Sequence, residues 1–159
     1  MDQLVRHHVS GQRKVAPEHV APEALDAMGK PQVGFYDSFM DEYAQAVDRA
    51  DLNQYCIPYF IAAHPGSTLD SAIELALYLV KEKFIPDQVQ EFYPTPGTIS
   101  TCMYYTGLDP RPGRKFAPIH VPKGRERHLQ RALLHFHKPE NQALVREALR
   151  LAGRPELIK

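Results

Sequence analysis

Four polar side chains stand where the sequence pattern changes from one secondary-structure element to the next. Glu18 and His19 follow a short candidate strand, Lys30 follows the next candidate helix, and His64 ends a nearly continuous apolar run. A carboxylate accepts strong charge-assisted hydrogen bonds from an ammonium group or from the diol of a ribose. The acid and the imidazole therefore make the first strand-to-helix joint a candidate ligand-facing site.

Each of these side chains also has a purely structural interpretation. An acid such as Glu18 is favourable near a helix start, and Lys30 fits a solvated charge near a helix C-terminus. His19 fits a surface imidazole, and His64 fits an imidazole bonded to a turn carbonyl. Spacing alone leaves both interpretations open.

Hydrophobic patterns define the elements that must position these residues. The predicted elements are a strand at 12–16, helices at 22–28 and 33–50, a strand at 54–64, a helix at 69–84 and a strand at 88–95. This order is typical of a parallel α/β sheet, in which ligands bind at the carboxyl ends of the strands. We therefore expect the strand ends at 17–19, 63–66 and 93–97 to converge on one rim.

The composition changes after about residue 107. The stretch GLDPRPGRKFAPIHVPKGRER is rich in Pro, Gly and Arg and predicts an irregular connection, after which two amphipathic helices follow. The predicted fold is α/β: a partial parallel (β/α) barrel of about three strands with helices over residues 1–107. Residues 108–159 are predicted to form an irregular linker and a small α-helical C-terminal domain.

Composition excludes several classes of protein. Lys plus Arg equals Asp plus Glu at 19 each, which gives no overall attraction to nucleic acid or anionic lipid. Two cysteines are too few for a disulfide framework. The apolar runs fall short of a membrane helix, and the first twelve residues do not resemble a signal peptide. We expect a cytoplasmic chain without a membrane partner.

Metal and nucleic-acid sites are not expected from the remaining residues. The eight histidines lack chelating spacing, since His135 and His137 are two apart and point to different sides of a helix. The basic run KGRERHLQR lacks interleaved aromatic residues, so it fits a solvated helix face better than a phosphate-binding surface. Cys102, Tyr104 and Tyr105 fit core or interface packing first, with substrate contact as the alternative.

Four segments together resemble the YgiQ-type radical SAM proteins. They are HHVSGQRKVAPEHVAPEALDAMGKP, QYCIPYFIAAHPGSTLDSAIELALYL, QVQEFYPTPGTISTCMYYTGLDP and RALLHFHKPENQALVREALRLAGRPELI. They follow that family's order over nearly the whole chain, and APEH, HPGST, FYPTPGT and TCMYYTG are specific in combination.

The resemblance implies a protein larger than this chain. Family members have a cobalamin-binding-like N-terminal region, a radical SAM barrel and a small C-terminal domain. In radical SAM proteins three cysteines in CxxxCxxC spacing hold a 4Fe-4S cluster that binds S-adenosylmethionine (SAM) and cleaves it reductively to a 5′-deoxyadenosyl radical. That motif is absent here, because Cys56 and Cys102 are the two cysteines of the sequence. The chain resembles barrel strands four to six plus the C-terminal domain, as a fragment, a split gene or a remnant without activity.

The resemblance also implies cofactor-binding residues. Glu18 matches an acid that ends the fourth strand near the SAM ribose or amino group, and His19 follows it. Lys30 matches a basic position that can approach the SAM carboxylate. Residues 60–66, which include His64, match the fifth-strand region along the adenine, although IAAHPGS replaces the usual glycine-rich pattern.

Two functions of different classes follow. The first is the SAM-facing part of a radical SAM enzyme, inactive alone, whose partner is the missing N-terminal half of the barrel in cis or as a separate chain. The alternative is a non-catalytic half-barrel that binds a partner. A hydrolase built on Glu18 and His19 has no nucleophile-elbow or triad pattern to support it.

Overall fold

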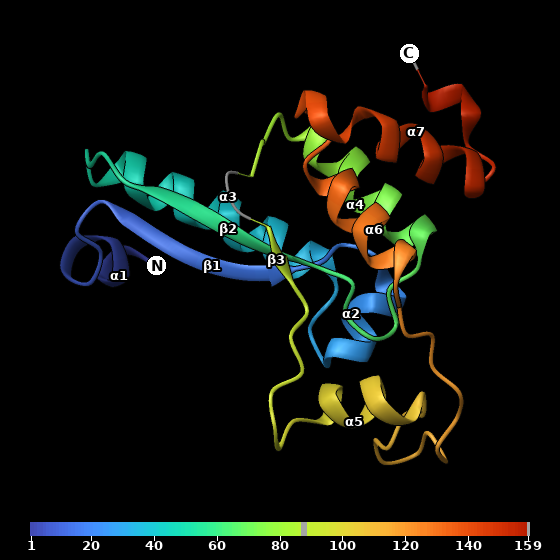
Figure 1. Cartoon of the computed structure of the whole chain (residues 1–159). Coiled ribbons are helices and arrows are strands. Elements are labelled where there is room, and N and C mark those ends of the chain that lie inside the picture. Colours follow the sequence, from blue (N-terminus) through green and yellow to red (C-terminus); the bar gives the residue numbers. More distant parts are fainter. Residues whose placement is uncertain (87–88, 159) are drawn as a thin grey trace.

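A three-stranded parallel sheet with helices around it organises the chain (Figure 1). The structure is a computed structural model that describes residues 1–86 and 89–158. The elements are α1 Asp2–His7, β1 Gln12–Glu18, α2 Pro22–Met28, α3 Val33–Arg49, β2 Tyr55–Ala62, α4 Leu69–Lys81, β3 Gln90–Glu91, α5 Ile99–Thr106, α6 Arg125–Leu134, η1 Pro139–Asn141, α7 Gln142–Leu151 and η2 Pro155–Leu157. Parallel strands joined by helices, followed by a helical C-terminal region, confirm the predicted fold class.

The sheet has the strand order β1-β2-β3, and its long pair is β1 with β2. This pair runs from Gln12 opposite Tyr55 to Glu18 opposite Phe60, with a register shift after Val15. Val15 is the partner of Pro58, and a proline removes one ladder donor, so the pairing becomes irregular there.

The third strand is much shorter than the predicted 88–95, of which Gln88 lies outside the described residues. Gln90 and Glu91 pair with Ile61 and Ala62 at the end of β2. The Phe92 N–H also donates to the Ala62 carbonyl oxygen at 2.8 Å, after which the chain leaves the sheet. The sheet therefore has three strands at its carboxyl edge and two strands elsewhere.

The helices follow local sequence signals. Thr68 and Ser71 form a capping box at the start of α4, and that helix buries Ala72, Ile73 and Leu75 on one face. In α2, Pro22 stands in the first turn and Gly29 ends the helix in the left-handed conformation. Both predicted helices are confirmed, but α4 ends at Lys81 and not at the predicted residue 84.

Helix α5 was not predicted. Its eight residues are too few to show a clear helical period, and they contain both apolar and polar side chains throughout. Its caps carry the signal instead: Thr98 Oγ1 accepts a hydrogen bond from the Thr101 N–H at 3.2 Å, and Gly107 is left-handed.

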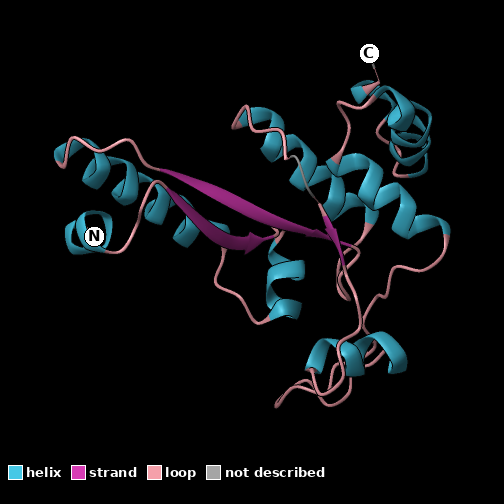
Figure 2. Cartoon of the chain, turned by 60° about the vertical axis from the view of Figure 1, so that its left-hand side comes forward, coloured by secondary structure: helices cyan, strands magenta, loops and turns pink. Residues whose placement is uncertain are grey.

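The main core joins the sheet to the C-terminal helices. Buried side chains from β2, α4, α6 and α7 form one cluster, which includes Phe60, Ile73, Leu75, Leu129, Leu133 and Ala148. Figure 2 shows α4, α6 and α7 stacked beside the carboxyl end of β2, while α3 lies along the other end of the sheet. The domain boundary at residue 107 stays a prediction, but residues after it share the core of those before it.

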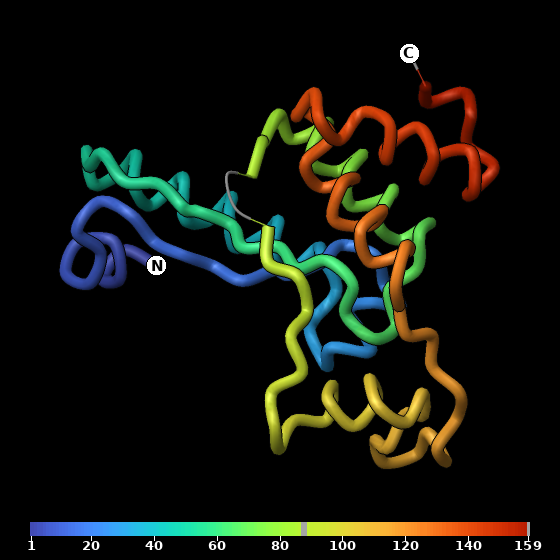
Figure 3. Tube along the Cα trace, viewed as in Figure 1, coloured from blue at the N-terminus to red at the C-terminus, as the bar shows by residue number. Residues whose placement is uncertain are grey.

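The trace in Figure 3 places the N-terminus with α1 at one end of the molecule and the C-terminus beyond α7 at the other. α1 packs on α3 through a second, smaller cluster of Val5, Tyr43 and Ala46. Among residues 1–86 and 89–158, no helix combines the length and apolar character needed to cross a membrane.

Candidate functional site

The turn after β1 holds Glu18 in an unusual backbone conformation. Its φ is 64°, and the His19 N–H donates to the Pro17 carbonyl oxygen at 2.8 Å, across one residue. A three-residue turn with a positive central φ is the rarer, strained form of γ-turn. This turn ends the strand abruptly and leaves the Glu18 carboxylate at the carboxyl edge of the sheet.

Lys30 reaches the same edge because of how α2 ends. The Gly29 N–H donates to Asp26 O and the Lys30 N–H donates to Leu25 O, each at 2.9 Å, which is the Schellman pattern. From there Lys30 Nζ donates to the Ala16 carbonyl oxygen at 2.6 Å. It also lies 3.2 Å from Glu18 Oε1, and both side chains are 29% exposed. The two predicted residues therefore form a solvent-accessible ion pair.

His19 is buried at the start of α2, with 2% of its surface exposed. Its Nδ1 accepts hydrogen bonds from the Val20 N–H at 3.0 Å and the Ala21 N–H at 3.1 Å, so the proton of the neutral ring is on Nε2. Burial, with a smaller effect of nearby His64, lowers the pKa of His19 to about 4. In this structure His19 satisfies backbone groups at a helix start.

His64 is buried at the end of β2, after Ala63, whose φ is 60°. Its Nδ1 lies 2.6 Å from the Pro65 carbonyl oxygen, which can only accept, so Nδ1 donates. Its Nε2 then accepts from Ser100 Oγ at 2.8 Å. Burial lowers the pKa of His64, while the Pro65 bond and the charge of Glu18 oppose that effect. The bond to a turn carbonyl is the structural role that the sequence left open.

The end of β3 connects to this site through α5. The Thr95 carbonyl oxygen accepts hydrogen bonds from Thr98 Oγ1 at 3.0 Å and Thr101 Oγ1 at 2.7 Å, in the first turn of α5. That same turn carries Ser100, the partner of His64. Thr95 itself is exposed, and its side chain bonds only locally.

The structure therefore brings Glu18, His19, Lys30 and His64 to the carboxyl edge of one parallel sheet. The carboxylate of Glu18 and the ammonium of Lys30 are the accessible charges, whereas both imidazoles are neutral and mostly enclosed. A cavity of about 390 Å³ is lined by His19, Lys30 and residues of β1 and α3, but Glu18 and His64 are not among its lining residues. A carboxylate next to an ammonium complements a zwitterionic ligand or a ligand with a diol.

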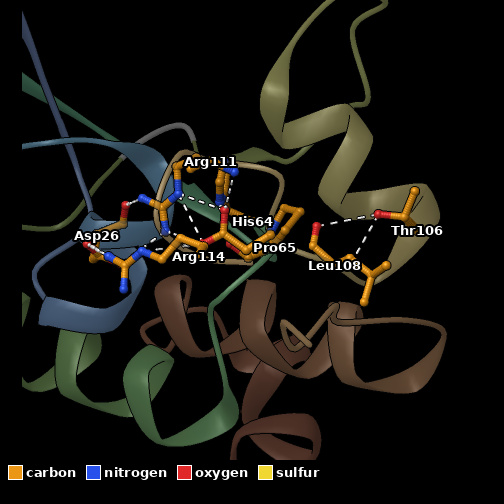
Figure 4. A network of polar contacts seen from close by, with 8 residues as sticks. Asp26, His64, Pro65, Thr106, Leu108, Arg111 and Arg114 are labelled. Atoms are coloured by element: carbon orange, nitrogen blue, oxygen red, sulfur yellow. Dashed lines mark hydrogen bonds and ion pairs between the residues drawn. The ribbon is translucent and has the colours of Figure 1, made fainter. Parts of the chain in front are cut away.

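Several residues of the site were not found from the sequence. Ser100 contacts His64 from 36 positions away. Asp26 of α2 lies against Arg111 and Arg114 (Figure 4). Gln130 of α6 bonds to the loop after β2. These contacts are long-range, and no local pattern indicates them.

The described residues contain no group of three or more His, Cys, Asp or Glu side chains that could hold a metal ion. Cys56 is half-buried on β2 and Cys102 is exposed on α5. The residues of this chain therefore do not fit an iron–sulfur cluster, which needs three thiolates in radical SAM proteins.

This chain is similar in sequence to several curated bacterial proteins. UPF0313 proteins of Clostridium botulinum (strain 657 / Type Ba4) and Clostridium perfringens (strain 13 / Type A) are each 49% identical over 157 residues. That of Geobacter sulfurreducens is 48% identical over 158 residues. These three relatives are UPF0313 proteins. UPF0313 is the YgiQ-like family, so these matches support the resemblance at that level.

The matches cover 98–99% of this chain but 23–26% of these relatives. The chain thus spans about a quarter of the length of the curated relatives it matches. Residues 87–159 match the model of a domain of unknown function, DUF3362. No solved structure matches the chain.

Proposed function

We propose that this chain forms the SAM-facing carboxyl edge of a radical SAM protein, together with the protein's C-terminal domain. The observation that carries the proposal is the accessible Glu18–Lys30 pair at the carboxyl end of a parallel strand, with an N···O distance of 3.2 Å. Ligands of parallel α/β folds bind at this edge.

The side-chain chemistry fits SAM. Glu18 would accept hydrogen bonds from the ribose diol or the α-ammonium group, and Lys30 would pair with the carboxylate. When bound, SAM supplies the 5′-deoxyadenosyl group. His19 and His64 would hold the two strand ends in place rather than exchange protons, because burial keeps both rings neutral near pH 7. The chain's own part is to bind SAM, orient it and exclude water.

The cluster belongs to another part of the protein. This chain has two cysteines and spans about a quarter of its relatives' length, so a CxxxCxxC segment elsewhere in cis, or on a second chain, is the required partner. β1 has no strand on its outer side within the described residues, which leaves an edge for further barrel strands.

Anaerobic co-expression with the CxxxCxxC-bearing part tests this proposal. The expected result is a complex that binds iron and releases 5′-deoxyadenosine from SAM when reduced. A complex that assembles and holds its cluster but forms no 5′-deoxyadenosine would contradict the enzyme proposal. That outcome would support the interaction module instead.

A further inference from the structure

Residues after position 107 contact the chain that follows each strand of the sheet. The contact with β2 is the most buried of the three. Gln130 of α6 is 1% exposed, and its Oε1 accepts from the Ala63 N–H at 3.1 Å. Ser67 Oγ lies 2.9 Å from the same oxygen and 2.8 Å from the His64 carbonyl oxygen, so its one proton serves two acceptors. Gln130 therefore contacts the chain both before His64, at Ala63, and after it, at Ser67.

The same face of α6 reaches β3. Arg127, one turn before Gln130, donates to the Phe92 carbonyl oxygen and to Tyr104 Oη, each at 3.1 Å. It also forms an ion pair with Glu91 in β3. Phe92 packs edge-to-face on His64 with ring centroids 5.0 Å apart. Arg127 thus holds Phe92, a second neighbour of His64, in place.

The third contact reaches α2, which carries Lys30 at its end. Arg111 Nη1 donates to the Asp26 carbonyl oxygen, and Nη2 lies 3.0 Å from Asp26 Oδ2. Asp109 holds the guanidinium from the other side and is itself buried. Asp26 also accepts the Gly29 N–H in the turn that directs Lys30 toward Glu18.

We propose that residues 111–130 act as a brace, which holds the chain after β1, β2 and β3 in place, with Gln130 as the positioning residue for His64. This assigns a role to part of the segment that matches a domain of unknown function. An unrelated helical appendage would bury apolar surface, but it would not supply a buried amide oxygen to the loop after β2. The role in ligand binding rests on the proposed function, whereas the placement of His64 does not.

The test compares two variants in the reconstituted complex, in which this chain carries ¹³C-labelled histidine. Gln130→Met keeps the side-chain volume but removes the acceptor for Ala63 and Ser67. Leu133→Val destabilises the same helix without touching the loop. His64→Gln assigns the His64 resonance.

The measured quantities are the His64 titration by NMR and the dissociation constant for SAM in the reconstituted complex. Gln130→Met is expected to move the His64 pKa toward its ordinary value by about half a unit or more, because water enters the opened loop. It is also expected to weaken SAM binding about tenfold. Leu133→Val should change neither.

Arg127→Lys provides a second route to the same question. It keeps a positive charge near Glu91 but loses the paired donors to Phe92 and Tyr104. A smaller shift of His64 in the same direction supports the brace. If His64 titrates unchanged in Gln130→Met and Arg127→Lys, the brace is wrong. If wild-type complex fails to bind SAM, the proposed function fails, and the His64 titration still decides the brace.

Discussion

Gly66, in the loop after β2, lies so close to Ala27 of α2 that a Cβ on Gly66 would overlap the Cβ of Ala27. Gly66 has a φ of 92°, and its N–H donates to the His120 carbonyl oxygen at 2.7 Å. Helix α2, the loop after β2 and the 107–124 connection therefore meet at one backbone position. Only glycine satisfies both the conformation and the spacing there.

Gly66→Ala is expected to destabilise the chain by about 2–4 kcal/mol, the sum of the left-handed backbone cost and overpacking. Gly113→Ala is the matched control, because its φ is 82° but nothing lies within 4 Å of the added Cβ. That control should cost about 1–2 kcal/mol. Urea unfolding of the two variants measures the difference, and equal losses would show that the contact with Ala27 has no effect.

The topology of the site could be predicted from the sequence, but its interactions could not. Parallel strands with joining helices place Glu18 and His64 at one edge whatever the details. Pro and Gly signals also located the turns that present them. The partners Ser100, Gln130 and Arg111 come from elements 36 to 85 positions away, and only the packed core decides those pairings.

The burial of His19 was also not predicted from the sequence. From the sequence, the structural interpretation of His19 was a surface imidazole. Instead its ring is enclosed and accepts two N–H groups at the start of α2. A local pattern does not contain this information, since the enclosing side chains come from the rest of the fold.

The folded chain should lose stability in acid because of His19. Its folded pKa is about 4, below the ordinary value of 6.5, so the unfolded chain binds more protons between these values. Stability is therefore fully present above about pH 6.5 and falls by up to about 3 kcal/mol as the pH drops to about 4. His64 contributes in the same direction.

His19→Asn tests this pH dependence, because the amide oxygen can accept the same backbone N–H groups without titrating. Unfolding free energies between pH 4 and 7 should change less steeply in this variant. His7→Asn, at an exposed position of α1, should keep the wild-type slope. A His19→Asn slope as steep as that of the wild type would contradict the role of His19.

The contacts of Arg111 with Asp26 and Asp109 should contribute more to stability than those of its neighbour Arg114. Asp109 is buried and its pKa is lowered mainly by the hydrogen bonds of Arg111. Arg111→Met would leave that carboxylate without its principal partner, at a cost of about 2–4 kcal/mol. Arg114→Met removes a half-exposed pair with Asp26 and should cost about 1 kcal/mol or less. Thermal unfolding of the two variants shows which one loses more stability. Equal losses would contradict the larger contribution of Arg111.

The isolated chain is expected to self-associate at high concentration. β1 has an open edge in the described sheet, and large side chains such as Phe35, Tyr55 and Tyr93 are exposed. Sedimentation velocity over a range of concentrations measures this association. A monomer at all concentrations would contradict the expectation. Adding the CxxxCxxC-bearing part should suppress the association.

The affinity of the reconstituted complex for SAM tests the central claim most directly. Glu18→Gln and Lys30→Met should each weaken SAM binding about tenfold or more. Their unfolding free energies should change by about 1 kcal/mol or less, because the pair is partly exposed. Arg49→Met, which breaks a more exposed pair with Asp2 at the far end of the sheet, should leave the affinity unchanged. Wild-type affinity in both Glu18→Gln and Lys30→Met would contradict the account.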